Sequence, residues 1–179
     1  MTPCFEKLAE RGALFRNFYS ASTRSCKALL ATLYGIPPQV GDEIFTQHPS
    51  FSLRGLPDLL KERGYHNVYL HNGDIDFDRQ QEFLLSHGFD IVQGRQELRK
   101  AFAGKSTANS WGIHDEYLMR HAYDFLLTQE QSGKRCFLYL FTVSNHHPWR
   151  LPPGVEKRAF QTKEGLSEAP FLQTMHYTD

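Results

Sequence analysis

The sequence predicts an α/β fold in which helices flank a layered, mostly parallel sheet. Helical patterns alternate with short apolar runs along most of the chain, an order that is typical of this class. Glycine closes two of the predicted helices, at Gly64 and Gly88, and a short apolar strand follows each of them. The run RCFLYLFTVS, rich in aromatic and β-branched residues, is typical of a strand at the centre of such a sheet.

The first third of the chain predicts a helix, a strand and a second helix. Residues 3–11 place apolar side chains on one helical face, and Gly12 ends that helix. The run ALFRNFYS, residues 13–20, has the composition of a strand. Residues 25–34 are expected to form a helix that ends at Gly35, before a pair of prolines.

The rest of the chain repeats this alternation. A loop rich in glycine, proline and polar residues is expected from the end of the second helix to about residue 54. Helix and strand then follow each other in LPDLLKERGYHNVYLHNG and again in RQQEFLLSHGFDIVQG. A polar stretch at 93–112 leads to a helix from about Asp115 to Gln129 and then to the apolar strand 136–144. Residues 145–179 have the composition of a loop, with a helix starting near the end.

Size and charge restrict the function classes. A chain of 179 residues is about one domain, and its 20 Lys and Arg balance 20 Asp and Glu. It lacks the basic excess of a nucleic-acid binder, so no nucleic-acid partner is expected. No apolar run approaches the roughly 20 residues that cross a bilayer, so we expect this chain itself to be soluble. Cys4, Cys26 and Cys136 are too few and too widely spaced for a disulfide framework, and we expect free thiols.

Polar and ionisable residues gather where three of the predicted strands end. Ligands of parallel α/β folds bind at the carboxyl ends of the strands. Hydroxyl residues follow the run 14–19, LHNGDIDFD surrounds the end of 67–71, and TVSNHHPW surrounds the end of 136–144. We therefore expect these three strands in one sheet, with a candidate site along their common edge.

The hydroxyl cluster STRSCK has two interpretations. Ser and Thr at a helix start satisfy free N–H groups as N-caps. Alternatively, Ser25 or Thr23 is a nucleophile on a helix N-terminus, where the same N–H groups favour an anion. A hydroxyl needs a metal ion or an adjacent base to become a good nucleophile. Arg24 could neutralise a phosphate or sulfate oxygen, whereas Lys27 is better explained as a solvated side chain.

The acidic residues after the second strand do not make an EF-hand. Counted from Asp74, loop position six is Arg79 and position twelve is Leu85, where calcium loops carry glycine and glutamate. Asp76 and Asp78 fit the acidic N-terminus of a helix. His71 and Asp74 are the better candidates for lining a pocket.

Two further segments contribute candidates. In SNHHPW, neighbouring side chains point apart, so one histidine is expected to face a bound anion while the other packs against Trp149. In WGIHDEYLM, Asp115 lies near a helix N-cap, and Trp111 is either core or pocket wall.

Read in order, several stretches resemble one family. They are TPCFEKLAERGALFRNFYSASTRSCKALLATLYGIPP, LPDLLKERGYHNVYLHNGDIDFD, FLLSHGFD, WGIHDEYL, FTVSNHHPWRLP and HYTD. Together they resemble the sulfatase-like branch of the alkaline phosphatase superfamily, and within it the lipoteichoic acid synthase and phosphoglycerol transferase group. The resemblance implies a bacterial enzyme with an extracytoplasmic catalytic domain behind transmembrane helices at the cell membrane. It also implies transfer of a lipid headgroup through a covalent phospho-threonine, with manganese, zinc or magnesium.

Carried over by position, the resemblance assigns roles to particular residues. Ser25 matches the nucleophile and metal ligand, with Thr23 as the alternative nucleophile. His146 matches a substrate-contacting histidine, and His71 and Asp74 fall in the segment that contacts the headgroup. We add to these the substrate-binding candidates that the residues themselves suggest, Arg24 and Trp111. The expected substrate is an anionic lipid headgroup or another phosphate or sulfate ester.

The chain also departs from the family pattern. The family's first acidic metal ligand should precede residue 1, and its Asp-His pair should follow Asp179. We therefore expect residues 1–179 to be part of a single catalytic domain, without its N-terminal strand and its C-terminal metal-ligand region. The partners would then include the remainder of its own chain, and the fragment alone is expected to be inactive.

Two alternatives remain open at this point. A sulfatase needs the pattern C/S-x-P/A-x-R, but Leu30 stands where the arginine should follow Cys26, and Arg24 stands where Pro or Ala should follow Ser22. Sulfuric-ester hydrolysis is therefore the weaker interpretation. The other alternative is a non-catalytic fragment that only binds an anionic headgroup.

Overall fold

A parallel sheet organises the part of the chain that the computed structural model describes, residues 1–38 and 51–179. Its strands are β1 (His66–His71), β2 (Ile91–Gln93) and β3 (Cys136–Phe141), in the order β2-β1-β3. Strand β1 pairs in parallel with both neighbours, and its register with β3 runs from His66 opposite Cys136 to His71 opposite Phe141. The α/β class with a parallel sheet is confirmed.

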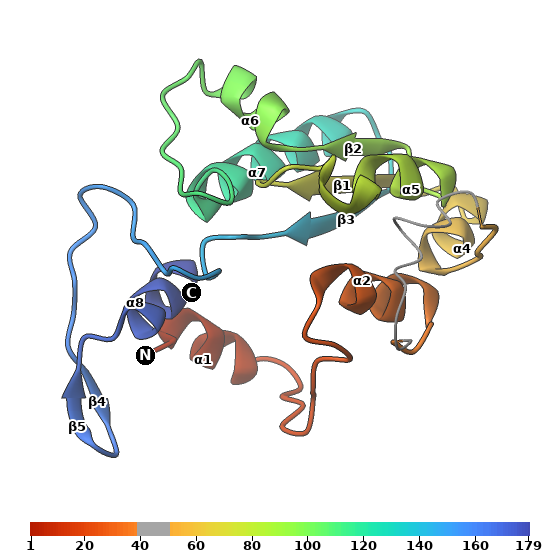
Figure 1. The fold of residues 1–179 in the computed structure, drawn as a ribbon. Coiled ribbons are helices and arrows are strands. Elements are labelled where there is room, and N and C mark those ends of the chain that lie inside the picture. The colour runs from red at the N-terminus through yellow and green to blue at the C-terminus, as the bar shows by residue number, and fades with distance from the viewer. Residues whose placement is uncertain (39–50) are drawn as a thin grey trace.

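Helices surround this sheet, and a short antiparallel hairpin lies outside it (Figure 1). The helices are α1 (Pro3–Ala9), α2 (Ser25–Tyr34), α4 (Leu56–Glu62), the 3-10 turn η1 (Phe77–Arg79), α5 (Gln80–Ser86), α6 (Arg95–Ala101), α7 (Asp115–Gln131) and α8 (Pro170–Thr178). The hairpin consists of β4 (Phe160–Thr162) and β5 (Gly165–Ser167). The predicted loop after Gly35 lies mostly at 39–50, outside the described residues.

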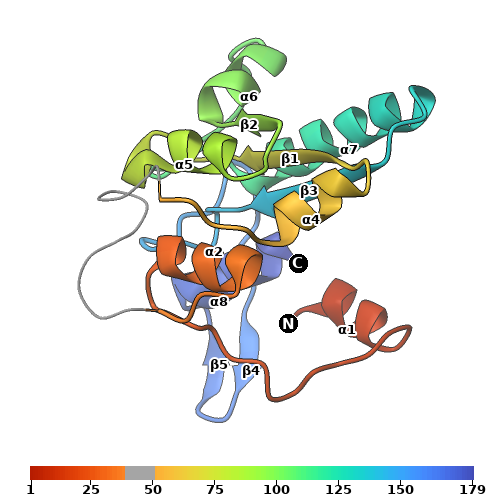
Figure 2. The same ribbon diagram turned by 90° about the vertical axis from the view of Figure 1, so that its right-hand side faces the viewer.

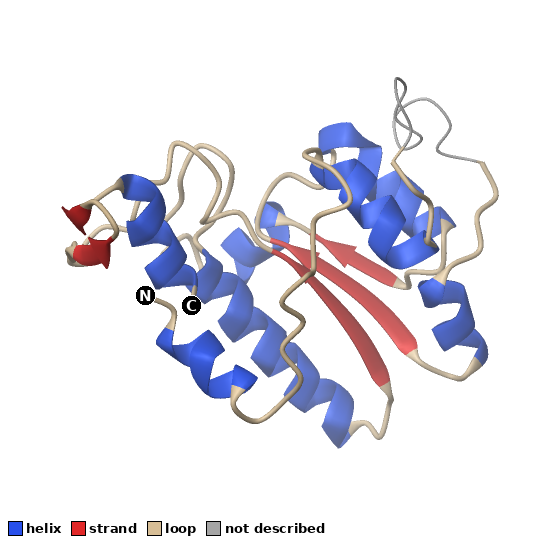
Figure 3. Ribbon diagram, turned by 90° about the horizontal axis from the view of Figure 1, so that it is seen from below, coloured by secondary structure: helices blue, strands red, loops and turns tan. Residues whose placement is uncertain are grey.

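Alternating side chains of β1 build a core on each face of the sheet. Tyr69 packs with residues of α2 and α5, whereas Val68 and Leu70 pack with Leu98 of α6 and Leu118 of α7. Such alternation follows from the two-residue period of a strand. Figure 3 shows the resulting layers, with helices on both faces of the sheet.

The central strand differs from the prediction. We expected 136–144 to be central, but β1 is the strand with two neighbours, and Val68, Tyr69 and Leu70 are each 0% exposed. Strand β3 pairs only with β1 among the described residues, and its side chains are half-buried. High apolar content alone therefore did not identify the strand with the most contacts.

The predicted strand at 13–20 is wrong. These residues form turns and irregular backbone, and Phe15, Phe18 and Tyr19 are 77%, 84% and 80% exposed. Figures 1 and 2 show the segment as an extended loop that joins α1 to α2. An aromatic run becomes a strand only where a neighbouring strand supplies hydrogen bonds, and no described strand pairs with this one.

Two regions have more structure than predicted. The polar stretch 93–112 contains α6, whose start is stabilised by Glu97, since its carboxylate accepts a hydrogen bond from Gly94 N at 3.0 Å. The final region contains the β4–β5 hairpin in addition to the expected helix α8.

The two ends of the chain meet. Asp179 accepts hydrogen bonds from the backbone N–H groups of Cys4 and Phe5 at 2.8 and 2.9 Å, and thus holds the start of α1 against α8. The three cysteines are free thiols, as predicted. Across the described residues, the helices are too short or too polar to span a lipid bilayer.

Candidate active site

A cavity of about 410 Å³ lies where the carboxyl ends of β1 and β3 face the N-terminus of α2. It brings together two of the three polar strand ends that the sequence singled out and the hydroxyl cluster that precedes α2. The lining residues are Thr23, Arg24, Ser25, His71, Phe77, Asp78, Gln80, Trp111, Phe141, Thr142, Val143, Asn145 and His146. Ser25 and His146 therefore lie on the same side of the molecule.

The hydroxyl residues before α2 divide into two groups. Ser20 and Ser22 shape the turn, because Ser20 Oγ donates to Ser22 O at 2.6 Å and Ser22 Oγ accepts from Arg24 N at 3.1 Å. Thr23 and Ser25, by contrast, line the cavity. Ser25 is the first residue of α2, and no side chain caps that helix from the N-cap position, Arg24.

Among the described residues, no histidine or carboxylate is hydrogen-bonded to the hydroxyl of Thr23 or Ser25, although His71 and His146 line the same cavity. What the position does supply is the N-terminal end of a ten-residue helix, whose partial positive charge favours an anion at that point.

Arg24 brings a positive charge to the cavity. Its guanidinium lies 4.0 Å from the carboxylate of Asp78, and the two side chains are 56% and 16% exposed. We predicted Asp78 only as an acidic residue at a helix start, but the structure places it in the cavity lining. Its φ of 55° lies in the left-handed region of backbone conformation.

His71 is held in one orientation by β3. Its Nδ1 donates to Phe141 O at 2.7 Å, so Nε2 is the nitrogen that can accept a hydrogen bond from a ligand. Burial lowers the pKa of His71 below 6.5, an effect that the Phe141 carbonyl and nearby carboxylates only partly offset. The imidazole is therefore neutral at neutral pH.

Gly73 fits the space beside this ring. A Cβ atom at position 73 would lie 2.4 Å from His71 Nε2, closer than real contacts allow. The sequence analysis did not single out Gly73, because a close approach of this kind becomes visible only in three dimensions.

Trp111 forms a wall of the cavity, which resolves the choice between core and pocket. Its indole lies 4.0 Å from the His146 ring, centroid to centroid, and Phe77 meets it edge-on at 6.3 Å. His147 is absent from the lining, and its ring lies 4.5 Å from the His146 ring, 5.9 Å from Trp111 and 6.4 Å from Trp149, centroid to centroid. Only His146 lines the cavity, as expected of one histidine, but the two rings do not point apart, so that part of the prediction is wrong.

Asp74 lies in a smaller adjoining cavity of about 220 Å³, which also contacts His71 and Trp111. Its carboxylate forms an ion pair with Arg95 at 2.6 Å, and its other oxygen accepts a hydrogen bond from Asp76 N. Asp74 therefore lines a pocket, as predicted, but its charge is already matched by Arg95.

A buried hydrogen-bond network around Asp115 connects the segments that follow β1 and β3 to the start of α7. Asp115 Oδ1 accepts hydrogen bonds from Asn72 Nδ2 at 2.6 Å, Ser144 N at 3.0 Å and Val143 N at 3.2 Å, and Ser144 Oγ accepts one from Asp115 N at 2.9 Å. The N-cap of α7 is His114, so Asp115 is the first helical residue. It links the ends of β1 and β3 to α7.

The donor chemistry of the cavity does not fit a divalent cation. Ser25 and Thr23 offer neutral hydroxyls, and the one carboxylate in the lining, Asp78, faces Arg24. His71 and His146 do not join this carboxylate in a cluster that could hold a metal ion. Catalytic metal ions usually take about three protein ligands. Within residues 1–38 and 51–179, no group of three or more His, Cys, Asp or Glu side chains could hold a metal ion.

Comparison with known proteins decides the family. The family model described as sulfatase matches residues 1–179. The chain belongs to the sulfatase family. Over 93 residues, 52% of this chain, it is 37% identical to phosphoglycerol transferase I of Salmonella typhi and of Salmonella newport, and the match covers 12% of each relative.

Solved structures agree with this family assignment. An alkaline phosphatase superfamily protein from Vibrio parahaemolyticus superposes with a TM-score of 0.81 at 28% identity, over 98% of this chain and 42% of that one. Lipoteichoic acid synthase LtaP from Listeria monocytogenes has a TM-score of 0.77 at 20% identity, over 90% of this chain and 39% of that one. The predicted resemblance to this superfamily is confirmed. The chain of this sulfatase-family member spans less than half of either structure.

Proposed function

We propose that this chain is part of an enzyme that transfers phosphoglycerol, or a related phospho-headgroup, through a covalent phosphoester on Ser25. The observation that carries the proposal is the single cavity in which the hydroxyls before α2 face His146 and Trp111. The similarity to phosphoglycerol transferase I supports the choice of headgroup.

In the proposed reaction, Ser25 Oγ attacks the phosphorus of an anionic lipid headgroup. The Oγ–P bond forms as Oγ–H loses its proton and the bond from phosphorus to the lipid alcohol breaks, and that alcohol takes up one proton, so the step balances. An acceptor hydroxyl then attacks the same phosphorus and loses its proton, while the Oγ–P bond breaks and Ser25 Oγ regains one. The N-terminus of α2 and Arg24 stabilise negative charge on the phosphoryl oxygens. Trp111 and His146 hold the rest of the headgroup, and His71 Nε2 accepts a hydrogen bond from one of its hydroxyls.

We propose a divalent cation, manganese, zinc or magnesium, for the whole enzyme and not for this chain alone. The described residues do not form a metal site, so its carboxylate and histidine ligands would have to come from other parts of the protein. We also propose that the whole protein is bound to the cell membrane, with this domain outside the cytoplasm and active in modifying envelope polymers or glycans.

The competing candidate is a domain that binds anionic headgroups without transferring them. The absence of a metal-ligating cluster from the described residues favours it for this stretch considered alone. Sulfuric-ester hydrolysis remains less favoured, because the sulfatase pattern C/S-x-P/A-x-R, counted from Cys26, has Leu30 in place of its arginine.

Headgroup transfer by the full-length enzyme tests the proposal. With a radiolabelled phosphoglycerol lipid as donor, Ser25→Ala should abolish transfer, because no other group replaces the attacking oxygen. Ser86→Ala removes a hydroxyl remote from the cavity, bonded to Glu82 O, and should leave transfer unchanged. Full transfer activity of Ser25→Ala together with loss of transfer in Thr23→Ala would identify Thr23 as the nucleophile instead of Ser25. Activity in both variants would refute a nucleophile in this cluster, and headgroup binding without transfer in the wild type would favour the competing candidate.

A further inference from the structure

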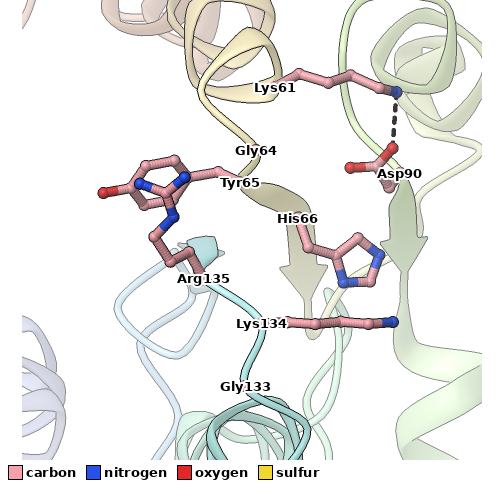
Figure 4. Close-up of a pocket in the computed structure, with 8 residues that line it drawn as sticks. All are labelled: Lys61, Gly64, Tyr65, His66, Asp90, Gly133, Lys134 and Arg135. Carbon is pink, nitrogen blue, oxygen red and sulfur yellow. Dashed lines mark ion pairs between the residues drawn. The ribbon is translucent and has the colours of Figure 1, made fainter.

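A second cavity, of about 470 Å³, lies at the opposite end of the sheet, by the amino ends of β1 and β3 (Figure 4). Strand β1 spans six residues, so about 17 Å separates its two ends. The proposed function uses none of this cavity. It is lined by Lys61, Gly64, Tyr65, His66, Asp90, Gly133, Lys134 and Arg135.

The one carboxylate in this lining, Asp90, is already engaged. Its Oδ1 lies 2.7 Å from Lys61 Nζ, and its Oδ2 accepts a hydrogen bond from Asn67 N at 2.9 Å. Burial alone would raise the pKa of Asp90, but these two interactions together outweigh it and lower the pKa. Asp90 is therefore ionised, and among the described residues its ion pair with a lysine or arginine is the one with Lys61.

Two more cations face the cavity without a carboxylate. Arg135 lies over the Tyr65 ring, 5.0 Å from its centroid, and donates to Arg63 O. Lys134 Nζ forms no hydrogen bond or ion pair with any residue that the structure describes. In Figure 4 its side chain runs below the His66 ring, whereas Asp90 and Lys61 lie above that ring. The lining thus holds three permanent cations and one carboxylate.

Helix ends explain only part of this charge. Helices α4 and α7 both end beside the cavity, and a helix C-terminus carries about half a negative charge, which favours nearby lysines. Two such ends offset about one positive charge at most. The three cations of the lining exceed its one carboxylate by two positive charges. About one positive charge is therefore left after the helix ends are counted, and it can attract an anionic ligand.

His66 offers a further contact. Its Nδ1 lies 3.0 Å from Gln129 Oε1. Because an amide oxygen can only accept, Nδ1 is the donor in this hydrogen bond. Nε2 is then the ring nitrogen that is left to contact a ligand. With the hydrogen on Nδ1, Nε2 can accept a hydrogen bond from a hydroxyl group of a ligand while Lys134 Nζ donates to an anionic oxygen.

We infer that this cavity is a second anion site, which binds a small phosphate- or sulfate-bearing ligand between Lys134 Nζ and His66 Nε2. Lysine ammonium groups bind phosphate as point charges, and the contact strengthens where no carboxylate competes. The inference does not depend on the proposed function, since it concerns other residues at the other end of the sheet.

Titration followed by ¹H–¹⁵N NMR tests the inference on this 179-residue chain. Inorganic phosphate replaces chloride at constant ionic strength, so general screening stays fixed. We expect saturable shifts of the Gly133, Lys134 and His66 amides. Lys134→Met should weaken the apparent affinity at these amides at least fivefold, and Lys134→Glu should abolish it. The matched control Lys157→Met removes an exposed lysine elsewhere and should leave the affinity unchanged.

Titrations with two ligands, inorganic phosphate and glycerol 1-phosphate, show whether the site prefers a free ion or a phosphoester. Saturable shifts with inorganic phosphate indicate a free-ion site, and at least tenfold tighter binding of glycerol 1-phosphate indicates a phosphoester site. Equal affinities for wild type and Lys134→Met would overturn the inference. So would saturable shifts confined to the residues around Ser25 and His146.

Discussion

Replacement of Asp115 by alanine removes the centre of the buried network beneath the candidate site. Its Oδ1 accepts hydrogen bonds from Val143 N at 3.2 Å and from Ser144 N at 3.0 Å, both in buried surroundings. Each buried N–H group left without an acceptor costs about 1–3 kcal/mol. Water entering the vacated space recovers part of this cost. We therefore expect Asp115→Ala to lower the free energy of unfolding by about 2–4 kcal/mol.

Urea unfolding followed by circular dichroism measures this loss, and each kcal/mol should lower Tm by about 2–4 °C. Asp115→Asn keeps an acceptor oxygen, so it should lose less than half as much. Asp124→Ala changes an exposed aspartate on the same helix, and its effect should stay within about 0.5 kcal/mol. An Asp115→Ala variant as stable as the Asp124→Ala control would refute the reasoning.

Three further predictions concern the site and its histidines. Gly73→Ala places a Cβ 2.4 Å from His71 Nε2, so it should displace the imidazole, shift its NMR signals and weaken headgroup transfer by the full-length enzyme at least tenfold. Burial lowers the pKa values of His71, His114 and His121 below 6.5, so the unfolded chain binds these protons first as pH falls. The free energy of unfolding, measured in urea at pH 7.5 and 5.5, should therefore decline below about pH 6.5. Calorimetric titration of this chain with manganese or zinc at neutral pH should show weak binding at most, because a neutral Ser25 hydroxyl without acidic neighbours is a poor ligand.

Each of these predictions has a contradicting result. Gly12→Ala meets only an ordinary contact at 3.5 Å, so a Gly73→Ala variant that behaves like this control would contradict the close approach. A free energy of unfolding that rises on acidification would contradict the buried, neutral histidines. Tight one-to-one manganese binding that is lost in Ser25→Ala would show that the chain carries further ligands, with His71, Asp74 and His176 the first to test.

The sequence predicted the elements whose signals are local. The helix at 25–34 ends at Gly35, whose φ of 67° is a left-handed conformation that glycine adopts without strain, and the structure places α2 within these bounds. Helix α4 and strand β1 likewise follow from a helical pattern, a Gly64 stop and an apolar run.

The errors arose where the outcome depends on distant partners. The aromatic run at 13–20 has strand composition, but among the described residues it has no strand to pair with. Helix α6 was missed because its stretch is polar, although the Gly94-x-x-Glu97 spacing was a usable N-terminal signal.

The candidate site was predictable in part. Strand ends and hydroxyl composition pointed to His71 and to Ser25 or Thr23, the family resemblance selected His146, and the structure brings these residues to one cavity. The roles of Gly73 and Asp115 were out of reach, because one depends on a contact with a folded ring and the other on backbone groups 28 and 29 residues away.

Trapping the covalent intermediate tests the central claim most directly. The full-length enzyme is incubated with a phosphoglycerol lipid, quenched in acid during turnover and digested, and the peptide covering residues 18–38 is analysed by mass spectrometry. The account predicts a glycerophosphoryl group on Ser25, absent from the Ser25→Ala variant. A modification on Thr23 alone, or transfer activity with no modified residue in this peptide, would contradict it.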